Sequence, residues 1–415
     1  MLDPAINRRN GSLFLISNLL IYLAAPVIYV DVVQAALLDK LGTSVTIANI
    51  PASAYLFGSF VPIFLSWVVP YRLERGAVIW SNLVTAASLT IVLVALTFPV
   101  INALRIGAVV VDGLVQGCSA SVTSVYLYQC LGRGTTPEWR ARTLKLTLTF
   151  TPIAAVVGSL GAQFIMNGNL SFLHYPYDFA FLYFFGVLCT GTNALVATRY
   201  RLAEVKEVDH PPFFKYIVGC VRSFSSVRAL AFLWLAYVLC YSTLAVAPNL
   251  SVYSREAVGR EPKELIGFIL ALRFGFKSLT GYVLGIMLIR WGARAPVLGT
   301  MVLACAAVLW AWMVPGYWYL LAFGFLGAAE LGGNYFINYV ITASPTGDGA
   351  RNQSLLLLAA PAASLSPVLH GFLTDKFGFP GSFLFGSVAA LLGLLLILKI
   401  SPRPVARRQM EAQMG

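Results

Sequence analysis

Residues 199–228 read RYRLAEVKEVDHPPFFKYIVGCVRSFSSVR, a polar stretch between two almost continuously apolar halves of the chain. It contains six of the 29 Lys and Arg residues, three of the 17 Asp and Glu residues and a Pro-Pro pair. We therefore interpret it as a linker between two hydrophobic domains. Within it, residues 211–221 can form an amphipathic helix on a membrane surface, with Phe213, Phe214, Ile217 and Val218 facing lipid, or a solvated connector.

The composition of the chain is that of a membrane protein. Of its 415 residues, 58% are hydrophobic and 11% are charged, and the mean hydropathy is +0.78, whereas soluble domains carry about 25% charged residues. The net charge of +12 lies in short clusters between apolar runs, which indicates membrane topology and excludes nucleic acid as a partner. The six cysteines and three histidines lack metal-ligand spacing, so we expect no metal and no cofactor.

Twelve segments are long and apolar enough to span a bilayer, which takes about 20 residues each. They lie near 12–36, 46–70, 76–98, 101–131, 143–167, 178–200, 227–254, 263–289, 294–314, 317–344, 350–373 and 379–400. They predict an all-α integral membrane protein with two pseudo-symmetric six-helix bundles. The predicted bundles are 1–200 and 227–400, joined by the linker 201–226 and followed by a tail, 401–415. The polar start, MLDPAINRRNGS, has no small-residue cleavage site and predicts a retained first helix.

The distribution of Lys and Arg predicts the orientation. If the N-terminus is cytoplasmic, 21 basic residues fall on the cytoplasmic side and 5 on the other, and three more lie within spans. Cytoplasmic loops carry such an excess. We therefore expect both termini and the linker to be cytoplasmic in a monomeric, multi-pass protein of the plasma membrane, or of the inner membrane if the source is bacterial.

The two halves share features at equivalent positions, as an internal repeat would. The loop after the fourth segment has Pro, Glu138 and Arg142 in that order, and the loop after the tenth has Pro, Asp348 and Arg351. With twelve spans and a basic linker, the chain resembles the major facilitator superfamily of secondary transporters. The resemblance implies two bundles that rock around a cavity lined by the first, fourth, seventh and tenth helices, with a contribution from the eighth.

The signature loop of that superfamily, Gly-x-x-x-Asp-Arg-x-Gly-Arg-Arg, is partly present after the eighth segment. Residues 285–294 read GIMLIRWGAR, so that Ile289 stands at the Asp position, while Arg290 and Arg294 keep two of the arginines. The copy after the second segment is reduced to RLERG at 72–76. The resemblance implies that these loops latch the bundles together on the cytoplasmic side, with Glu74 or Glu138 supplying the missing carboxylate. The latch residues expected from it are Glu74, Arg75, Glu138, Arg142, Arg290 and Arg294.

The fourth segment contains a second partial motif. Residues 113–120 read GLVQGCSA and are similar to the Arg-x-x-Gln-Gly element of the drug–proton antiporters in the same superfamily. Gly113 occupies the Arg position, which counts against that branch.

Six ionisable residues fall inside the predicted spans, where each costs at least about 2.5–3.5 kcal/mol unless it faces protein or a water-filled cavity. They are Asp31, Arg105, Asp112, Arg273, Lys277 and Glu330. Helical spacing places other polar residues on the helix faces that carry these ionisable residues, and further polar residues lie on the seventh helix. Together they predict a central binding site. These additional candidates for substrate binding are Tyr22, Gln116, Tyr237, Tyr241, Asn334 and Asn338.

Arg273 and Lys277 have two interpretations. One turn apart on a helix, they repel unless negative charge lies between them. They either bind a carboxylate- or phosphate-bearing substrate, Arg as a bidentate fork and Lys as a point charge, or pair with Asp112, Glu330 or Asp31.

The acids also have two interpretations. Glu330 and Asp112 either carry protons, because a membrane carboxylate can be loaded on one side and unloaded on the other, or serve as charge partners for the bases. Asp31 and Arg105 both lie near the outer surface, so we expect them to form a structural or gating ion pair.

These features predict a secondary active transporter that works by alternating access and moves a small organic anion or zwitterion, coupled to protons or to sodium. The alternative is a drug/proton antiporter that exports amphiphilic compounds. A membrane enzyme or receptor is disfavoured because no nucleophile, histidine or metal constellation is visible. A nucleotide-binding Gly-x-x-x-x-Gly-Lys loop is also lacking, which argues against an ATP-driven pump.

Overall fold

The computed structural model describes residues 4–68, 73–170, 172–202, 212–344 and 349–400, and within these ranges the regular structure is entirely helical. Within these ranges, ten helical stretches are long and apolar enough to cross a membrane by length and composition. The prediction of an all-helical membrane protein is confirmed. The predicted tail, 401–415, lies outside the described residues.

The first two predicted spans are not among these ten, and both are interrupted. The first consists of α1 (Pro4–Leu23), α2 (Ala25–Ile28) and α3 (Val32–Lys40), and the second of α4 (Val45–Gly58) and α5 (Val61–Val68). Pro26, in the first turn of α2, has no backbone N–H to continue the hydrogen bonds of α1. The remaining helices of this half are α6 (Glu74–Thr97), α7 (Asn102–Gly134), α8 (Pro137–Met166) and α9 (Tyr177–Ala197).

The second half repeats this pattern of long and interrupted helices. Its seventh span comprises α11 (Arg228–Leu244), α12 (Ala247–Val252) and α13 (Ser254–Val258). The eighth and ninth are η2 (Pro262–Glu264) with α14 (Ile266–Trp291), and α15 (Arg294–Met313). The tenth is η3 (Gly316–Leu320), α16 (Leu321–Ala329) and α17 (Gly332–Ala343). The last two are α18 (Gly349–Leu357), α19 (Ala359–Ala362) and α20 (Ser366–Phe377), and then α21 (Phe379–Leu398).

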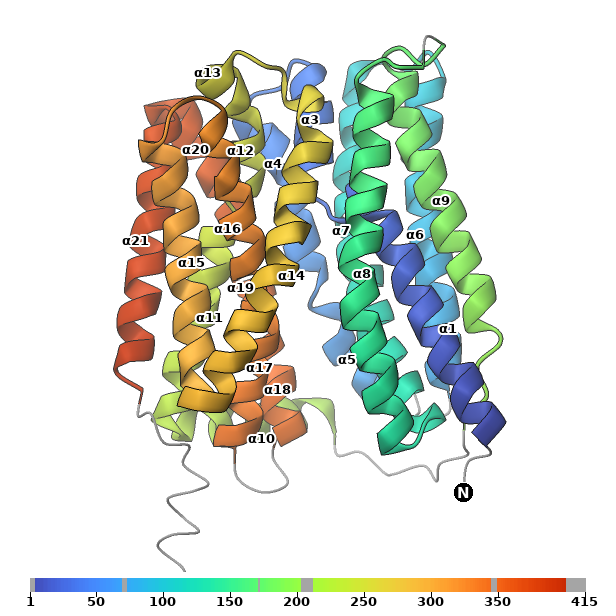
Figure 1. Ribbon diagram of the computed structural model, residues 1–415, viewed down its shortest axis with the longest axis vertical. Coiled ribbons are helices and arrows are strands. Elements are labelled where there is room, and N and C mark those ends of the chain that lie inside the picture. Colours follow the sequence, from blue (N-terminus) through green and yellow to red (C-terminus); the bar gives the residue numbers. More distant parts are fainter. Residues whose placement is uncertain (1–3, 69–72, 171, 203–211, 345–348, 401–415) are drawn as a thin grey trace, which may run out of the picture.

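The helices form two bundles that stand side by side, one from each half of the chain (Figure 1). α1 begins and α21 ends at the same end of the molecule, which also holds α10 (Phe213–Ser226). We call this the inner end. The opposite end, with α13 and the turn between α3 and α4, is called the outer end.

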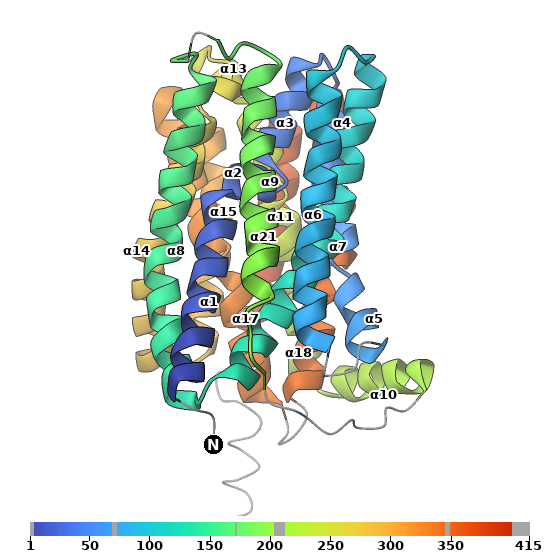
Figure 2. The same cartoon turned by 90° about the vertical axis from the view of Figure 1, so that its right-hand side faces the viewer.

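α10 lies in the predicted linker and runs across the direction of the spanning helices at the inner end (Figure 2). The amphipathic helix predicted for 211–221 is therefore present, displaced toward the C-terminus. Phe213 stacks on Phe64 of α5, with ring centroids 5.1 Å apart. Phe214 and Val218 are exposed, one helical turn apart.

The bundles contact each other in the outer half of the molecule. Gln163 of α8 binds the start of α14. Its side chain accepts a hydrogen bond from the Gly267 N–H (2.7 Å) and donates one to the Glu264 carbonyl (2.6 Å). A Cβ on Gly267 would lie 2.3 Å from Cβ of Gln163, so only glycine permits this approach. The ribbons of α8 and α14 diverge from this contact toward the inner end (Figure 1).

Candidate functional site

The interruption in the first span places Asp31 at the N-terminus of α3. Its carboxylate accepts a hydrogen bond from the Val32 N–H, and Gln34 accepts one from the Asp31 N–H (3.2 Å), which completes a capping box. Gln34 also donates to the Val27 carbonyl (3.0 Å), so its side chain hydrogen-bonds to the residues on both sides of the break between α2 and α3. An acid at a helix N-terminus is favoured by the helix dipole.

Glu330 lies at the corresponding break in the tenth span, between α16 and α17. It is the C-cap residue of α16 and stands two residues before α17 begins at Gly332. α14 is uninterrupted and presents Arg273 and Lys277 one turn apart. Two acids at helix breaks therefore meet two bases on a continuous helix.

These four residues form one cluster of ion pairs, which we call the central charge cluster. Arg273 contacts the carboxylates of both Asp31 and Glu330, and the Lys277 ammonium lies 2.7 Å from the other oxygen of Glu330. The side chains are 7% to 15% exposed. With two acids and two bases the cluster is neutral when all four are charged. The Asp31–Arg273 pair joins the two bundles, whereas the Glu330 pairs lie within the second.

Aromatic rings surround Lys277. Its ammonium lies 5.9 Å from the ring centroid of Tyr29 and 5.4 Å from that of Phe274. Tyr22 and Tyr29 also contact Phe274 edge-on, with centroids 6.0 and 5.3 Å apart. The predicted binding residue Tyr22 is thus part of this group. Phe274 was not predicted, because an apolar residue between two bases gives no signal in the sequence.

A cavity of about 180 Å³ opens beside these rings, on the face of the first bundle. It is lined by Asn18, Ile21, Tyr22, Ile28, Tyr29, Tyr55, Asn82, Thr85, Ala120, Thr123, Ser124, Leu127, Tyr128 and Thr190. We call it the tyrosine cavity.

Asp112 stands apart from the central charge cluster. It is 1% exposed and accepts hydrogen bonds from Ser88 and Gln116, both at 2.8 Å. Gln116 also donates to the Val27 carbonyl (3.1 Å), so it ties α7 to the broken first span. Among the described ion pairs none includes Asp112. Gln116, predicted to bind substrate, is completely buried and instead links helices.

The remaining predicted binding residues lie in the second bundle. The hydroxyls of Tyr237 and Tyr241 are 3.1 Å apart, and Tyr237 stacks on Phe336 with centroids 4.5 Å apart. On α17, Asn334 is exposed and Asn338 is half-buried.

The predicted pair between Asp31 and Arg105 is not formed. Arg105 donates to the carbonyls of Ala95 (3.1 Å) and Phe98 (3.4 Å) near its own end of the bundle. Asp31 turns instead to Arg273, because the break after α2 directs it toward the other bundle. The expectation failed because spacing along the chain cannot show which helix faces which.

The residues predicted to latch the cytoplasmic side make contacts within single bundles. Glu74, which is 1% exposed, pairs with Arg133 at 2.5 Å, and Arg75 donates to the Tyr200 carbonyl at 3.3 Å. Arg294 donates to the Ile397 and Leu398 carbonyls at the end of α21.

Three further latch candidates lie at the surface, and two motif residues cannot be placed. Glu138 and Arg290 are exposed, and Arg142 lies over the Trp139 ring, 5.3 Å from its centroid. Arg72 lies outside the described residues, as does Asp348. Across the described residues of the inner end, no ion pair among these predicted residues joins the two bundles.

The glycines of the partial antiporter motif serve helix packing. A Cβ on Gly113 would lie 2.5 Å from the Pro51 carbonyl oxygen, and one on Gly117 would lie 2.1 Å from that of Tyr55. α7 therefore packs against α4 backbone to backbone, which requires small residues. The Arg of the antiporter motif has no room at position 113.

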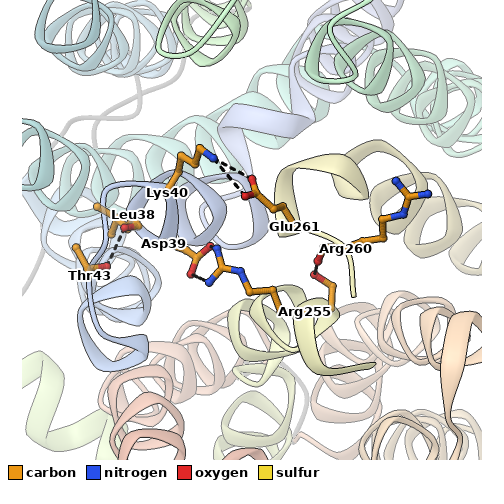
Figure 3. Close-up of polar contacts among 8 residues, drawn as sticks. Leu38, Asp39, Lys40, Thr43, Arg255, Arg260 and Glu261 are labelled. Carbon is orange, nitrogen blue, oxygen red and sulfur yellow. Dashed lines mark hydrogen bonds and ion pairs between the residues drawn. The ribbon is translucent and has the colours of Figure 1, made fainter. Parts of the chain in front are cut away.

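Three described ion pairs join the bundles at the outer end: Lys263 lies 4.0 Å from Asp178, and the two shorter pairs are drawn in Figure 3. Arg255 forms a bidentate pair with Asp39, at 2.8 and 2.7 Å, and Lys40 lies 3.0 Å from Glu261. We call these four residues the outer latch. They were not predicted, although adjacent opposite charges at 39 and 40, at the end of a span, were a visible signal.

Comparison with known proteins identifies the fold. No protein-family profile and no curated protein matches the sequence. Among solved structures, a variant of the nucleoside transporter NupG matches with a TM-score of 0.71 at 11% identity, covering 94% of this chain and 98% of that chain. A variant of the peptide transporter POT in complex with sulfate gives 0.68 at 15% identity, covering 97% and 95%.

A third match is FucP in the outward conformation, described as a major facilitator superfamily transporter. It gives a TM-score of 0.64 at 13% identity, covering 94% of this chain and 98% of that chain. The chain therefore has the fold of major facilitator superfamily transporters over nearly its whole length, as predicted.

Proposed function

We propose that the protein is a secondary active transporter that moves a small organic anion or zwitterion together with protons, by alternating access. The observation that supports this most directly is the central charge cluster, which is neutral, nearly buried and shared between the bundles. Intramembrane ion pairs of this kind are expensive and are usually retained for transport or coupling.

Charge balance links the proton to the substrate. With all four groups charged, Arg273 and Lys277 are fully compensated and an anion gains little from binding there. Protonation of Glu330 removes one negative charge and leaves the cluster at a net charge of +1. A carboxylate can then take the place of Glu330 at Lys277, so proton and anion bind together. We assign proton transfer to Glu330 and not to Asp112, because Glu330 contacts both bases, so an arriving carboxylate would compete with it for Lys277 and thereby favour its protonation.

The same cluster provides a link to the movement of the bundles. Arg273 is shared between Glu330 and Asp31, and only its pair with Asp31 crosses between bundles. A substrate that draws Arg273 toward itself weakens the cross-bundle pair. A ligand shifts a conformational equilibrium by the difference in its affinity for the two states, and this competition supplies such a difference.

The solved structures are in keeping with a proton-coupled transporter but do not indicate one substrate. They include a fucose:proton symporter and a D-xylose-proton symporter as well as the nucleoside and peptide transporters. Drug/proton antiport is disfavoured, because Gly113 replaces the motif Arg and packing excludes a larger side chain there.

The test is uptake by proteoliposomes of a panel of labelled organic anions, with and without an inward proton gradient. We expect gradient-driven accumulation that is lost in Lys277→Ala and no longer depends on the gradient in Glu330→Gln. Lys376→Ala and Glu256→Gln remove exposed charges of the same kinds at the outer end and should behave as wild type. Normal transport by Lys277→Ala, or movement of neutral and cationic compounds only, would refute the anion assignment.

A further inference from the structure

The tyrosine cavity differs chemically from the charge cluster beside it. Of its fourteen lining residues, four are tyrosines, four are Ser or Thr and two are Asn. None of these described lining residues carries a charge at neutral pH. The wall therefore offers many hydrogen-bonding groups and aromatic rings but nothing that would hold an ion.

Four of these polar groups donate a hydrogen atom to the protein backbone. Thr85 and Thr190 donate to the Ser81 and Gly186 carbonyls of their own helices, at 3.0 and 2.8 Å. The amides of Asn18 and Asn82 donate to carbonyls four residues earlier. A hydroxyl that has given its hydrogen away keeps oxygen lone pairs as acceptors, whereas an amide that has donated one hydrogen keeps the second as a donor. The wall thus offers both acceptors and donors and suits hydroxyl groups, which can do both.

Size and position complete the description of the ligand. At about 180 Å³, the cavity is smaller than the roughly 300–1,000 Å³ of sites for drug-sized ligands, and suits a single ring. Tyr29 lines the cavity and also lies 5.9 Å from the Lys277 ammonium. The cavity and the surroundings of Lys277 therefore share Tyr29.

We infer that the substrate is a small, hydroxyl-rich ring compound with one carboxylate, whose ring lies in the tyrosine cavity and whose carboxylate reaches Lys277. This inference rests on the proposed function for the carboxylate, whereas the ring assignment rests on the cavity alone. The hydroxyl groups donate to the oxygens of the wall, and the tyrosine rings cover the apolar ring faces.

Three probes of matched size separate the two assignments in the proteoliposome assay. D-Glucuronate has the ring, the hydroxyls and the carboxylate, cyclohexanecarboxylate lacks the hydroxyls, and D-glucose lacks the carboxylate. We expect glucuronate to bind and be transported about tenfold better than either of the others, since each unmet polar group in a built site is costly. Equal transport of cyclohexanecarboxylate would overturn the hydroxyl-rich ring and leave anion transport standing. Transport of glucose without glucuronate would overturn the proposed function instead.

Two variants test whether the ring of the substrate lies in the tyrosine cavity. Thr85→Val keeps the shape of the wall but removes an acceptor, and it should weaken glucuronate about fivefold without affecting cyclohexanecarboxylate. Thr90→Val, on the exposed face of the same helix, is the control. Tyr128→Phe, at a half-exposed position, repeats the test without disturbing buried packing, with the exposed Tyr282→Phe as its control. Loss that is equal for both probes, or absent from both cavity variants, would contradict this placement.

Discussion

Reversing the charge of Arg255 should shift the protein toward a state with an open outer end. Arg255 lies in α13, at the end of the seventh span, and holds Asp39 of the first bundle by two hydrogen bonds. Opening the outer end must break this pair. In the variant Arg255→Asp the pair is replaced by two like charges, so the closed state loses stability relative to the open one.

The size of the shift follows from the exposure of the two side chains. Arg255 is 49% exposed and Asp39 is 10% exposed. Exposed ion pairs contribute about 0.2–1 kcal/mol, and bidentate geometry places this one near the upper value. Two like charges about 4 Å apart cost from about 1 kcal/mol in water to about 4 kcal/mol at an effective dielectric constant near 20. We therefore expect a change of about 2 kcal/mol or more, which is about 30-fold in the equilibrium between the two states.

The assay is the distance between spin labels at Asn169 and Lys376, which are exposed at the outer ends of the two bundles. Arg255→Asp should move population from the shorter to the longer distance. The double variant Asp39→Arg with Arg255→Asp should restore the shorter distance, because it rebuilds the pair with reversed charges.

Arg260→Asp is the matched control for this experiment. Arg260 pairs with Glu264, four residues later in the same bundle, so this pair does not cross between bundles. It should leave the distances unchanged. A shift of equal size in both single variants, or failure of the reversed pair to restore closure, would refute the role of the outer latch.

Three further predictions concern the latch, helix packing and the buried acid. The hydrogen bond from Lys40 holds the pKa of Glu261 below its ordinary value near 4.5, so the Lys40–Glu261 pair stabilises the closed state above that pH and is lost only below it. The spin-label distances should therefore not change between pH 7.5 and about 5. A change in that interval that depends on Glu261 would contradict this prediction. Gly117→Ala places a Cβ 2.1 Å from a backbone oxygen and should destabilise the protein by about 1–3 kcal/mol, seen as a lower melting temperature in detergent than Gly161→Ala, where no atom lies within 4 Å. Asp112→Asn preserves a hydrogen-bond acceptor for Ser88 and Gln116, and no described cation pairs with Asp112, so the variant should retain proton-driven uptake. Loss of the dependence of uptake on the proton gradient would assign the coupling proton to Asp112.

Sequence reasoning was sufficient for the architecture because the bilayer imposes it. Long apolar runs have only one favourable location, and backbone groups inside a membrane must be hydrogen-bonded within helices. The polar segment 199–228 accordingly separates the bundles and contains α10. The breaks in the first and second spans were less visible, because their hydropathy is continuous although their helices are not.

The charged residues were identified from the sequence, but their pairing was not. Glu330 and Asp31 were both among the partners considered for Arg273, and the choice among three acids remained open. Asp31 is 242 positions away from Arg273 in the chain. Helical spacing shows which residues share one face, but it says nothing of the helix opposite.

The chain by itself determined that this protein is helical, membrane-spanning and divided in two, and that six ionisable residues lie inside its spans. Only the tertiary structure decided that four of them form one neutral cluster, that Asp112 stands alone among neutral partners and that Gly113 serves packing. Hydropathy is a property of each segment and adds along the chain. Ion pairing and close packing depend on distances between segments, which are set when the two bundles come together.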